Sequence, residues 1–233
     1  MLGEGGKEMA NDTAKQIAQM LEEAWNKFFD HYNKSASKYL KLWELNVKEL
    51  NEKDAKESHW ICWNEYDLMF YIGRFFYDIL KEKGEEEFKN IEIHFEKNVN
   101  FANFKDFKFK GRLDELKKRL KMNRGPKVDL IVAYEYKNDT FLLCAEVKCF
   151  HSASEHYGES PTKKISADVE KLKAIRDCGI AQKVVFMFFD DYYWWANKTI
   201  ADEIEKELDK IKKDEKIKVL SSSSEAKLEK HLK

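Results

Sequence analysis

Three charged side chains lie inside two apolar segments of this 233-residue chain. The segments VDLIVAY and TFLLCAEVKCF occupy residues 128–134 and 140–150, and the charged residues within them are Asp129, Glu146 and Lys148. A charged group in such a segment is costly to bury unless it is paired or binds a metal. Two carboxylates with an ammonium beside them would form a site for a hard cation.

The segment KND at residues 137–139 separates the two apolar segments and is typical of a tight turn, which predicts an antiparallel hairpin. Glu146 and Lys148 are two residues apart and therefore project from one face of their strand. A two-residue loop formed by the Lys and Asn would place Asp129 opposite Glu146, whereas a loop formed by the Asn and Asp would place it opposite Lys148. Either loop gathers the three charges on one face, but a three-residue loop would move Asp129 to the other face.

Asp129, followed after sixteen residues by Glu146-Val147-Lys148, resembles the motif of the PD-(D/E)xK nuclease superfamily. The pattern here departs from that motif in one respect, since Pro126 stands three residues before the aspartate rather than next to it. The resemblance implies a metal-dependent DNA endonuclease that hydrolyses phosphodiester bonds with Mg²⁺, for which Mn²⁺ can substitute. It implies that Asp129, Glu146 and the carbonyl oxygen of Val147 bind the metal. Lys148 would then orient a water or stabilise developing phosphate charge.

A helix is predicted at about residues 58–83, because its apolar residues recur at helical spacing. Glu65 lies within this apolar stripe, four residues after Ile61 and four before Met69. A carboxylate on a core-facing stripe needs a partner or a function. Glu65 would be paired with Arg74 or a lysine, would reach solvent at the helix edge, or would complete the metal site. The resemblance favours the metal site, because many superfamily members carry a glutamate on the helix that precedes the sheet.

Further elements are predicted on both sides of the hairpin. A half-buried strand at 91–99 precedes it, and a helix at about 164–178, ended by Gly179, follows it. The continuous apolar segment at 183–189 predicts a buried strand. The resulting αβββαβ order, over about residues 58–190, is the common core of the superfamily. We therefore expect an α/β fold with a restriction-endonuclease-like core, in which helices flank a mixed central sheet.

The predicted organisation is an N-terminal helical extension at 1–57, a nuclease-like domain at 58–220 and a polar tail at 221–233. A helix near 199–212 and a strand at 216–220 are expected at the periphery of the domain.

Within the N-terminal extension, residues 1–12 are expected to be disordered. Apolar spacing from Thr13 to about Leu50 predicts one long helix, or two with a break near Asn33–Ser37. This helical segment would serve as a packing arm or as a dimerisation arm. A homodimer is therefore one of the assemblies that the sequence allows.

The segment 103–127 carries ten basic and three acidic residues, although the net charge of the whole chain is −1. Phenylalanines are interleaved with these charges, and such a segment would neutralise phosphates and stack on unpaired bases. The alternative is a solvated basic helix that its phenylalanines anchor to the core. Lys171, on the helix after the hairpin, is added because superfamily members often place a basic or polar residue there near the scissile phosphate. The predicted nucleic-acid-binding residues are Lys105, Lys108, Lys110, Arg112, Lys117, Lys118, Lys121, Arg124 and Lys171.

Composition limits the other classes of protein. The chain lacks the GxxxxGK[ST] motif of an ATPase, and its four cysteines form no CxxC pair of the kind that binds zinc. It also lacks an N-terminal signal peptide and any apolar segment near the ~20 residues of a membrane span. We therefore expect a cytoplasmic protein whose partner is DNA and not a membrane.

Two other hypotheses stay open beside the nuclease. The chain would be a non-catalytic nucleic-acid-binding or assembly module that retains the nuclease-like fold, or an ordinary α/β interaction protein in which the charges form a structural ion pair. The complete set of Asp129, Glu146 and Lys148 favours the nuclease, because nothing but chemistry obviously requires it.

Overall fold

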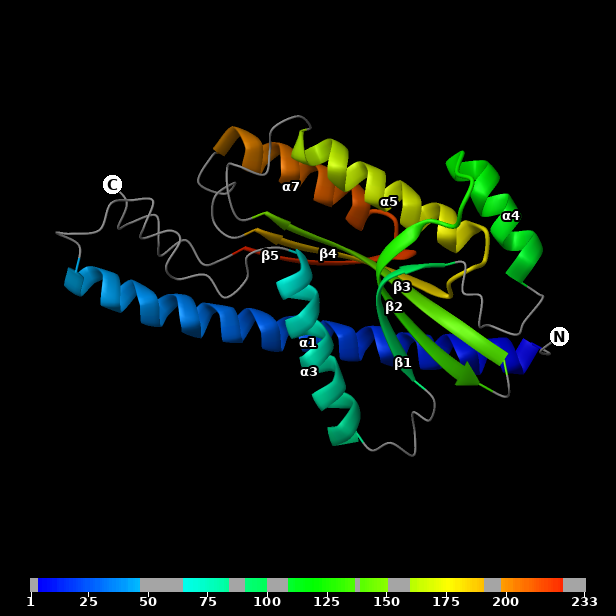
Figure 1. The fold of residues 1–233 in the computed structure, drawn as a ribbon, viewed down its shortest axis with the longest axis horizontal. Helices are drawn as coiled ribbons and strands as arrows, with labels where there is room; N and C mark the ends of the chain where they lie inside the picture. Colours follow the sequence, from blue (N-terminus) through cyan, green and yellow to red (C-terminus); the bar gives the residue numbers. More distant parts are fainter. Residues whose placement is uncertain are drawn as a thin grey trace.

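A computed structural model of the chain describes residues 4–46, 65–83, 91–99, 109–136, 139–150, 160–190 and 198–223. Figure 1 shows the fold. The helices are α1 (Glu4–Asn46), α3 (Glu65–Lys83), α4 (Phe109–Leu120), α5 (Pro161–Asp177) and α7 (Lys198–Lys212). The strands are β1 (Glu92–Asn98), β2 (Lys127–Tyr136), β3 (Asp139–Phe150), β4 (Lys183–Asp190) and β5 (Ile217–Ser223).

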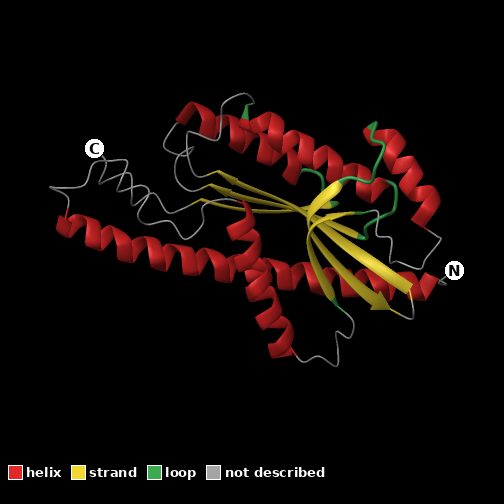
Figure 2. Ribbon diagram, viewed as in Figure 1, coloured by secondary structure: helices red, strands yellow, loops and turns green. Residues whose placement is uncertain are grey.

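The five strands form one mixed sheet in the order β1-β2-β3-β4-β5 (Figure 2). β1, β2 and β3 pair in antiparallel fashion, whereas β3, β4 and β5 are parallel. The predicted α/β class, with a mixed sheet flanked by helices, is confirmed. The strand expected at the periphery at 216–220 is an integral edge strand, because β5 pairs with β4 from Ile217 to Ser223.

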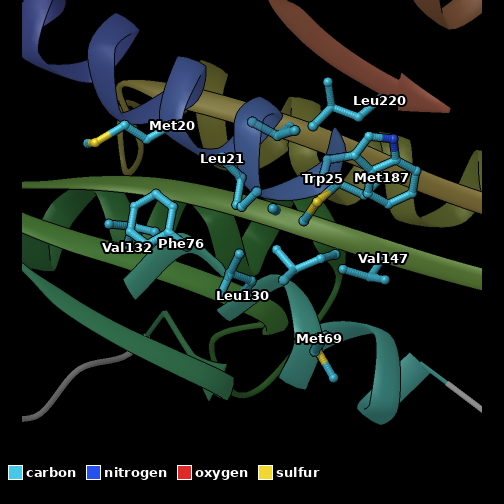
Figure 3. Packing of buried hydrophobic residues seen from close by; sticks show 14 of the residues in the cluster. Met20, Leu21, Trp25, Met69, Phe76, Leu130, Val132, Val147, Met187 and Leu220 are labelled. Atoms are coloured by element: carbon cyan, nitrogen blue, oxygen red, sulfur yellow. The ribbon is translucent and has the colours of Figure 1, made fainter. Parts of the chain in front are cut away.

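Alternate residues of the strands face two separate apolar cores, as the two-residue period of a strand requires. Leu130, Val132 and Val147 pack with α1 and α3, and Figure 3 shows this side of the sheet. Ile131 and Cys144 face the opposite way and pack with α5 and α7. Both faces of the sheet are therefore covered, and a charged side chain between the layers is removed from water.

α1 is one unbroken helix that begins at Glu4, so the expectation of disorder in residues 1–12 is wrong from Glu4 onward. The alternative break near residues 33–37 is absent as well. Asn and Ser lower helix propensity only slightly, and no proline removes a backbone hydrogen bond there. Trp25 and Phe28 of α1 lie fully within the core that α3 and the sheet share.

The β2–β3 register resolves the choice between hairpin loops. Tyr136 pairs with Asp139, so two residues separate the paired positions, and the register continues to Leu130 opposite Ala145. The loop formed by the Lys and Asn is therefore the correct alternative, and the register directs Asp129 toward Glu146.

The structure tests the first residues of one of two predicted helices. The described part of α3 begins at Glu65, and the predicted residues 58–64 lie outside the described ranges. α5 begins at Pro161, earlier than predicted, because the Ser160 side chain accepts a hydrogen bond from the backbone N–H of Lys163 and caps the helix. Gly179, at φ 67°, follows its end as predicted.

None of the helices described is both long and apolar enough to cross a membrane.

Phe28→Ala tests whether α1 belongs to the core. Its ring packs edge-on against Phe189 of β4 at a centroid distance of 5.2 Å. We expect the free energy of unfolding to fall by about 3–5 kcal/mol, the range for a buried phenylalanine truncated to alanine. Urea denaturation measures this change. Lys15→Ala, on the exposed face of the same helix, should change stability by no more than about 0.5 kcal/mol. Equal small effects would show instead that α1 is a dispensable arm.

Candidate active site

The candidate site lies where β3 continues beyond its pairing with β2. This pairing ends at Leu130 and Ala145, while residues 146–150 of β3 still pair with β4 on the other side. The backbone N–H of Val147 donates to Asp129 Oδ2 at 2.8 Å. Because the N–H and C=O of one strand residue point the same way, the Val147 carbonyl faces this side too. We call this side of residues 146–150 the β3 edge.

Lys148 joins the two helical layers at the β3 edge. Its ammonium donates to Glu65 Oε1 of α3 at 2.9 Å and lies 2.9 Å from Asp168 Oδ2 of α5. α3 and α5 cover opposite faces of the sheet. The Lys148 side chain contacts both helices because β2 no longer pairs with β3 at this position. A paired β2 strand would lie between the two helices. Glu65 is thus brought to the predicted site, and its partner is Lys148 rather than Arg74.

Lys171 of α5 lies against the predicted metal ligand Glu146. Its Nζ is 2.6 Å from Glu146 Oε2 and 3.4 Å from Asp168 Oδ1. It also donates to the carbonyl oxygen of Lys127 at 3.1 Å. The sequence predicts Lys171 near a substrate phosphate, and in the structure its ammonium lies among three protein oxygens of the candidate site.

Asp168 is a site residue that the sequence prediction did not include. Its carboxylate contacts both ammoniums of the site, Lys148 and Lys171. The available signal was its spacing of three residues from Lys171, which puts both side chains on one helix face. The resemblance placed Lys171 of this face near the site, but it did not select Asp168 as a site residue.

The site holds more negative than positive groups. Its carboxylates are Glu65, Asp129, Glu146 and Asp168, and its ammoniums are Lys148 and Lys171. Fully ionised, these four carboxylates and two ammoniums carry a net charge of −2. A buried excess charge is unfavourable, so this cluster needs protons or a further cation.

Glu146 is the carboxylate of this cluster that burial affects most. It is 1% exposed, and its Oε1 is buried without a hydrogen-bond partner among the described residues. Burial, followed by the charge of Asp129, raises the pKa of Glu146 to about 9. Burial also raises the pKa of Glu65, although the charge of Lys148 opposes the shift.

The two lysines stay charged at neutral pH. Burial by itself would lower the pKa of Lys148, but the carboxylates of Glu65 and Asp168 outweigh it and raise that pKa. For Lys171 burial likewise acts downward, and Glu146 and Asp168 raise the pKa. Neither lysine is therefore available as a general base, since its ammonium form is favoured.

The donor atoms of the site suit a hard cation, but lysine ammoniums lie between them. Carboxylate and carbonyl oxygens are the ligands that Mg²⁺ and Mn²⁺ prefer. Within the ranges that the structure describes, no three Asp, Glu, His or Cys side chains are grouped so that they hold a metal ion together. Glu146 Oε1, which has no hydrogen-bond partner among the described residues, could serve as a cation ligand, while Lys171 contacts the other oxygen of the same carboxylate.

The predicted basic segment contains a structural part. Arg112 of α4 donates to the carbonyl oxygen of Gly179 at 2.9 Å, and Arg119 donates to Asp177 at 2.9 Å. These two contacts fasten α4 to the end of α5, where helix carbonyls lack intrahelical partners. Arg112, predicted to bind nucleic acid, therefore has a role in holding two helices together.

The remaining predicted phosphate-binding residues fall into two groups. Lys118, Lys121 and Arg124 are exposed on α4 and on the turn that leads into β2, and Lys117 is paired with Asp114 at 3.7 Å. The others are not placed by the structure: Lys105 and Lys108 lie outside the described residues, and the side chain of Lys110 is not described.

Comparisons of the chain with protein-family models, curated proteins and solved structures find no match.

In metal-free buffer, Glu146→Gln is expected to stabilise the protein increasingly as the pH rises. The folded pKa of about 9 lies above the ordinary value of 4.5, so between these values the unfolded chain binds fewer protons than the folded one. Stability of the natural protein is therefore lost as the pH rises through this window. Glutamine does not ionise, and the variant escapes this loss.

Melting temperatures from about pH 4 to pH 9 in EDTA measure the effect, since 1 kcal/mol shifts them by roughly 2–4 °C in a chain of this size. The difference between the two proteins should vanish near the acid end. Glu170→Gln, on the exposed side of α5, is the matched control. A constant difference across the pH range would contradict the assignment of a raised pKa to Glu146.

Proposed function

We propose that the chain is a metal-dependent nuclease of the PD-(D/E)xK type that hydrolyses phosphodiester bonds in DNA, as an endonuclease. One observation carries the proposal: Asp129, Glu146 and Lys148 meet at the β3 edge, where carboxylates exceed ammoniums and a buried Glu146 oxygen lacks a partner among the residues that the structure describes. A restriction-endonuclease-like fold is part of this proposal. The order α3, β1, β2, β3, α5 and β4, with α4 inserted before β2, supports it.

Asp129, Glu146 and the Val147 carbonyl oxygen are the proposed metal ligands, with Glu65 as a further carboxylate. When bound, Mg²⁺ or Mn²⁺ would lower the pKa of a water and stabilise the negative charge that develops on the phosphate. Asp129 already accepts the N–H of Val147 through one oxygen, which fixes its carboxylate beside the Val147 backbone. A metal ligand whose position is fixed by a hydrogen bond favours a single geometry of the site.

Lys148 is proposed to orient the attacking water or to stabilise charge on the phosphate. Glu65 and Asp168 hold its ammonium from two sides at 2.9 Å, so its position is set before the substrate arrives. Donors fixed in advance stabilise developing charge without reorganising during the reaction. Glu65 and Asp168 are, in this scheme, positioning residues for Lys148.

The exposed lysines and arginine near the site are proposed to bind backbone phosphates. Lys118, Lys121 and Arg124 precede β2, and β2 carries Asp129 two residues after its start at Lys127. Phosphate contacts there would hold a strand next to the β3 edge.

A non-catalytic module that retains the fold is the second candidate. The observation that favours it is the ion pairing itself, because Lys148 and Lys171 already give partners to Glu65, Asp168 and one oxygen of Glu146. Cleavage assays separate the two candidates.

Glu146→Ala and Lys148→Ala are each expected to lower Mg²⁺- or Mn²⁺-dependent cleavage of plasmid and single-stranded DNA by at least about 100-fold, the effect typical of a lost transition-state contact. Glu170→Ala and Lys173→Ala, a paired glutamate and lysine on α5 away from the site, are the matched controls. Cleavage that survives both site substitutions would refute the nuclease. DNA binding without any cleavage would favour the second candidate.

Lys171→Met is expected to tighten Mn²⁺ binding by about tenfold, because it removes a positive charge from among the oxygens that would face the cation. Methionine keeps most of the side-chain volume. Isothermal titration calorimetry measures the affinity without any substrate, and Lys173→Met is the control on the same helix. An unchanged or weaker affinity in Lys171→Met would show that this ammonium does not compete with the metal.

A further inference from the structure

One face of α3 exposes large aromatic side chains. Tyr66, Phe70 and Tyr77 are 60%, 63% and 54% exposed. Their spacing of four and seven residues puts them on one side of the helix. Scattered surface aromatics are common, but three along one side of a helix suggest a binding function.

Basic side chains share this face of α3. At about 100° per residue, Arg74 and Lys81 fall within the same ~80° sector as the three aromatic residues. The Lys81 ammonium lies 5.2 Å from the centroid of the Tyr77 ring. Asp67 and Asp78 border this sector, about 20–40° beyond Arg74. We define the α3 stripe as Tyr66, Phe70, Arg74, Tyr77 and Lys81.

The edge strand β1 adds a further ring beside the α3 stripe. Phe95 is 43% exposed and lies over Gly73, where its ring fills the space that a Cβ would need. Because Gly73 has no side chain, the Phe95 ring reaches the helix backbone, and helix and strand together present an aromatic surface.

The α3 stripe begins at the candidate active site. Tyr66 directly follows Glu65, whose carboxylate is bound to Lys148. From Tyr66 to Lys81 the helix rises by about 22 Å, which is long enough to follow several nucleotides of an extended strand.

We propose that the α3 stripe and Phe95 bind a single-stranded segment of DNA, with unpaired bases on the aromatic rings and phosphates beside Arg74 and Lys81. Aromatic rings interleaved with basic groups are the means by which proteins bind single strands without reading their sequence. The choice of DNA rests on the nuclease proposed above, which this inference deepens by naming the substrate as unpaired DNA next to the scissile phosphate.

The chemistry of the stripe argues against two other occupants. Duplex DNA keeps its bases stacked inside, where exposed rings have no access to them. A second copy of the chain, packed around a two-fold axis, would bring this patch against itself and oppose like charges of Arg74 and Lys81. An unpaired strand satisfies both the rings and the cations.

Fluorescence anisotropy of the full chain in EDTA tests the proposal without cleavage. The probes are a labelled oligothymidylate of about 15 nucleotides, its duplex and an oligouridylate of the same length. Phe70→Ala and Tyr77→Ala should each weaken binding of the single-stranded DNA by about 5- to 150-fold, the range for one stacked base. Phe70→Tyr and Tyr77→Phe, which keep the rings, should bind nearly as well as the natural chain. Gln19→Ala, at an exposed and uncharged position on α1, is the control.

Several results would overturn the proposal: equal or tighter binding of the duplex, preference for the oligouridylate, or affinity for single-stranded DNA that both alanine variants leave unchanged. A dimer that Phe70→Ala converts to monomer, with DNA affinity intact in size-exclusion and anisotropy measurements, would assign the stripe to self-association instead. Stripe-dependent binding by a chain that never cleaves would refute only the nuclease. Cleavage that persists after loss of the rings, with unchanged affinity, would refute only the stripe.

Discussion

The hydrogen bond between the Val147 N–H and Asp129 is the constraint on which the site depends. At the β3 edge the β2–β3 ladder has ended, yet a buried backbone N–H still needs an acceptor. A carboxylate that replaces a backbone carbonyl satisfies this need and occupies little space. The helical layers on the two faces of the sheet therefore both reach Lys148, which an uninterrupted ladder would prevent. A local exception to strand pairing thus creates the contact between α3, β3 and α5.

The apolar sheet around these charges makes it costly to bury any of them without a partner. The charged side chains are therefore held in fixed pairs. Phe186 and Phe188 of β4 pair in register with Glu146 and Lys148, and both are fully buried. Charges in such surroundings persist only with close partners, which explains why each ammonium contacts two carboxylates at once. The pairing holds side chains from three elements in one arrangement, so the geometry exists before any ligand binds.

The sequence was sufficient for the hairpin and the buried strand, since two-residue alternation and turn chemistry are local properties. The choice between two loops required the register, because both gather the charges on one face. Tertiary partners decided the rest. α4 has the basic composition of a phosphate-binding helix, yet two of its arginines, Arg112 and Arg119, attach it to the end of α5. In the sequence, Asp168 and Lys171 are an ordinary helical pair. Only the packing of α5 on the sheet places Lys171 against Glu146. No periodicity in one helix reveals which strand it will cover.

Fold stability alone gives no reason for Glu146. A structural ion-pair network is most favourable when charges balance and every buried oxygen has a partner. Here four carboxylates face two ammoniums, and the most deeply buried carboxylate has an oxygen without a partner among the described residues. An amide or apolar side chain of similar size at this position would relieve both the excess charge and the desolvation cost. A proton on Glu146 relieves this cost in the metal-free chain. The metal ion proposed above would offset it as well, and a cation held by carboxylates beside a fixed ammonium would suit phosphoryl transfer.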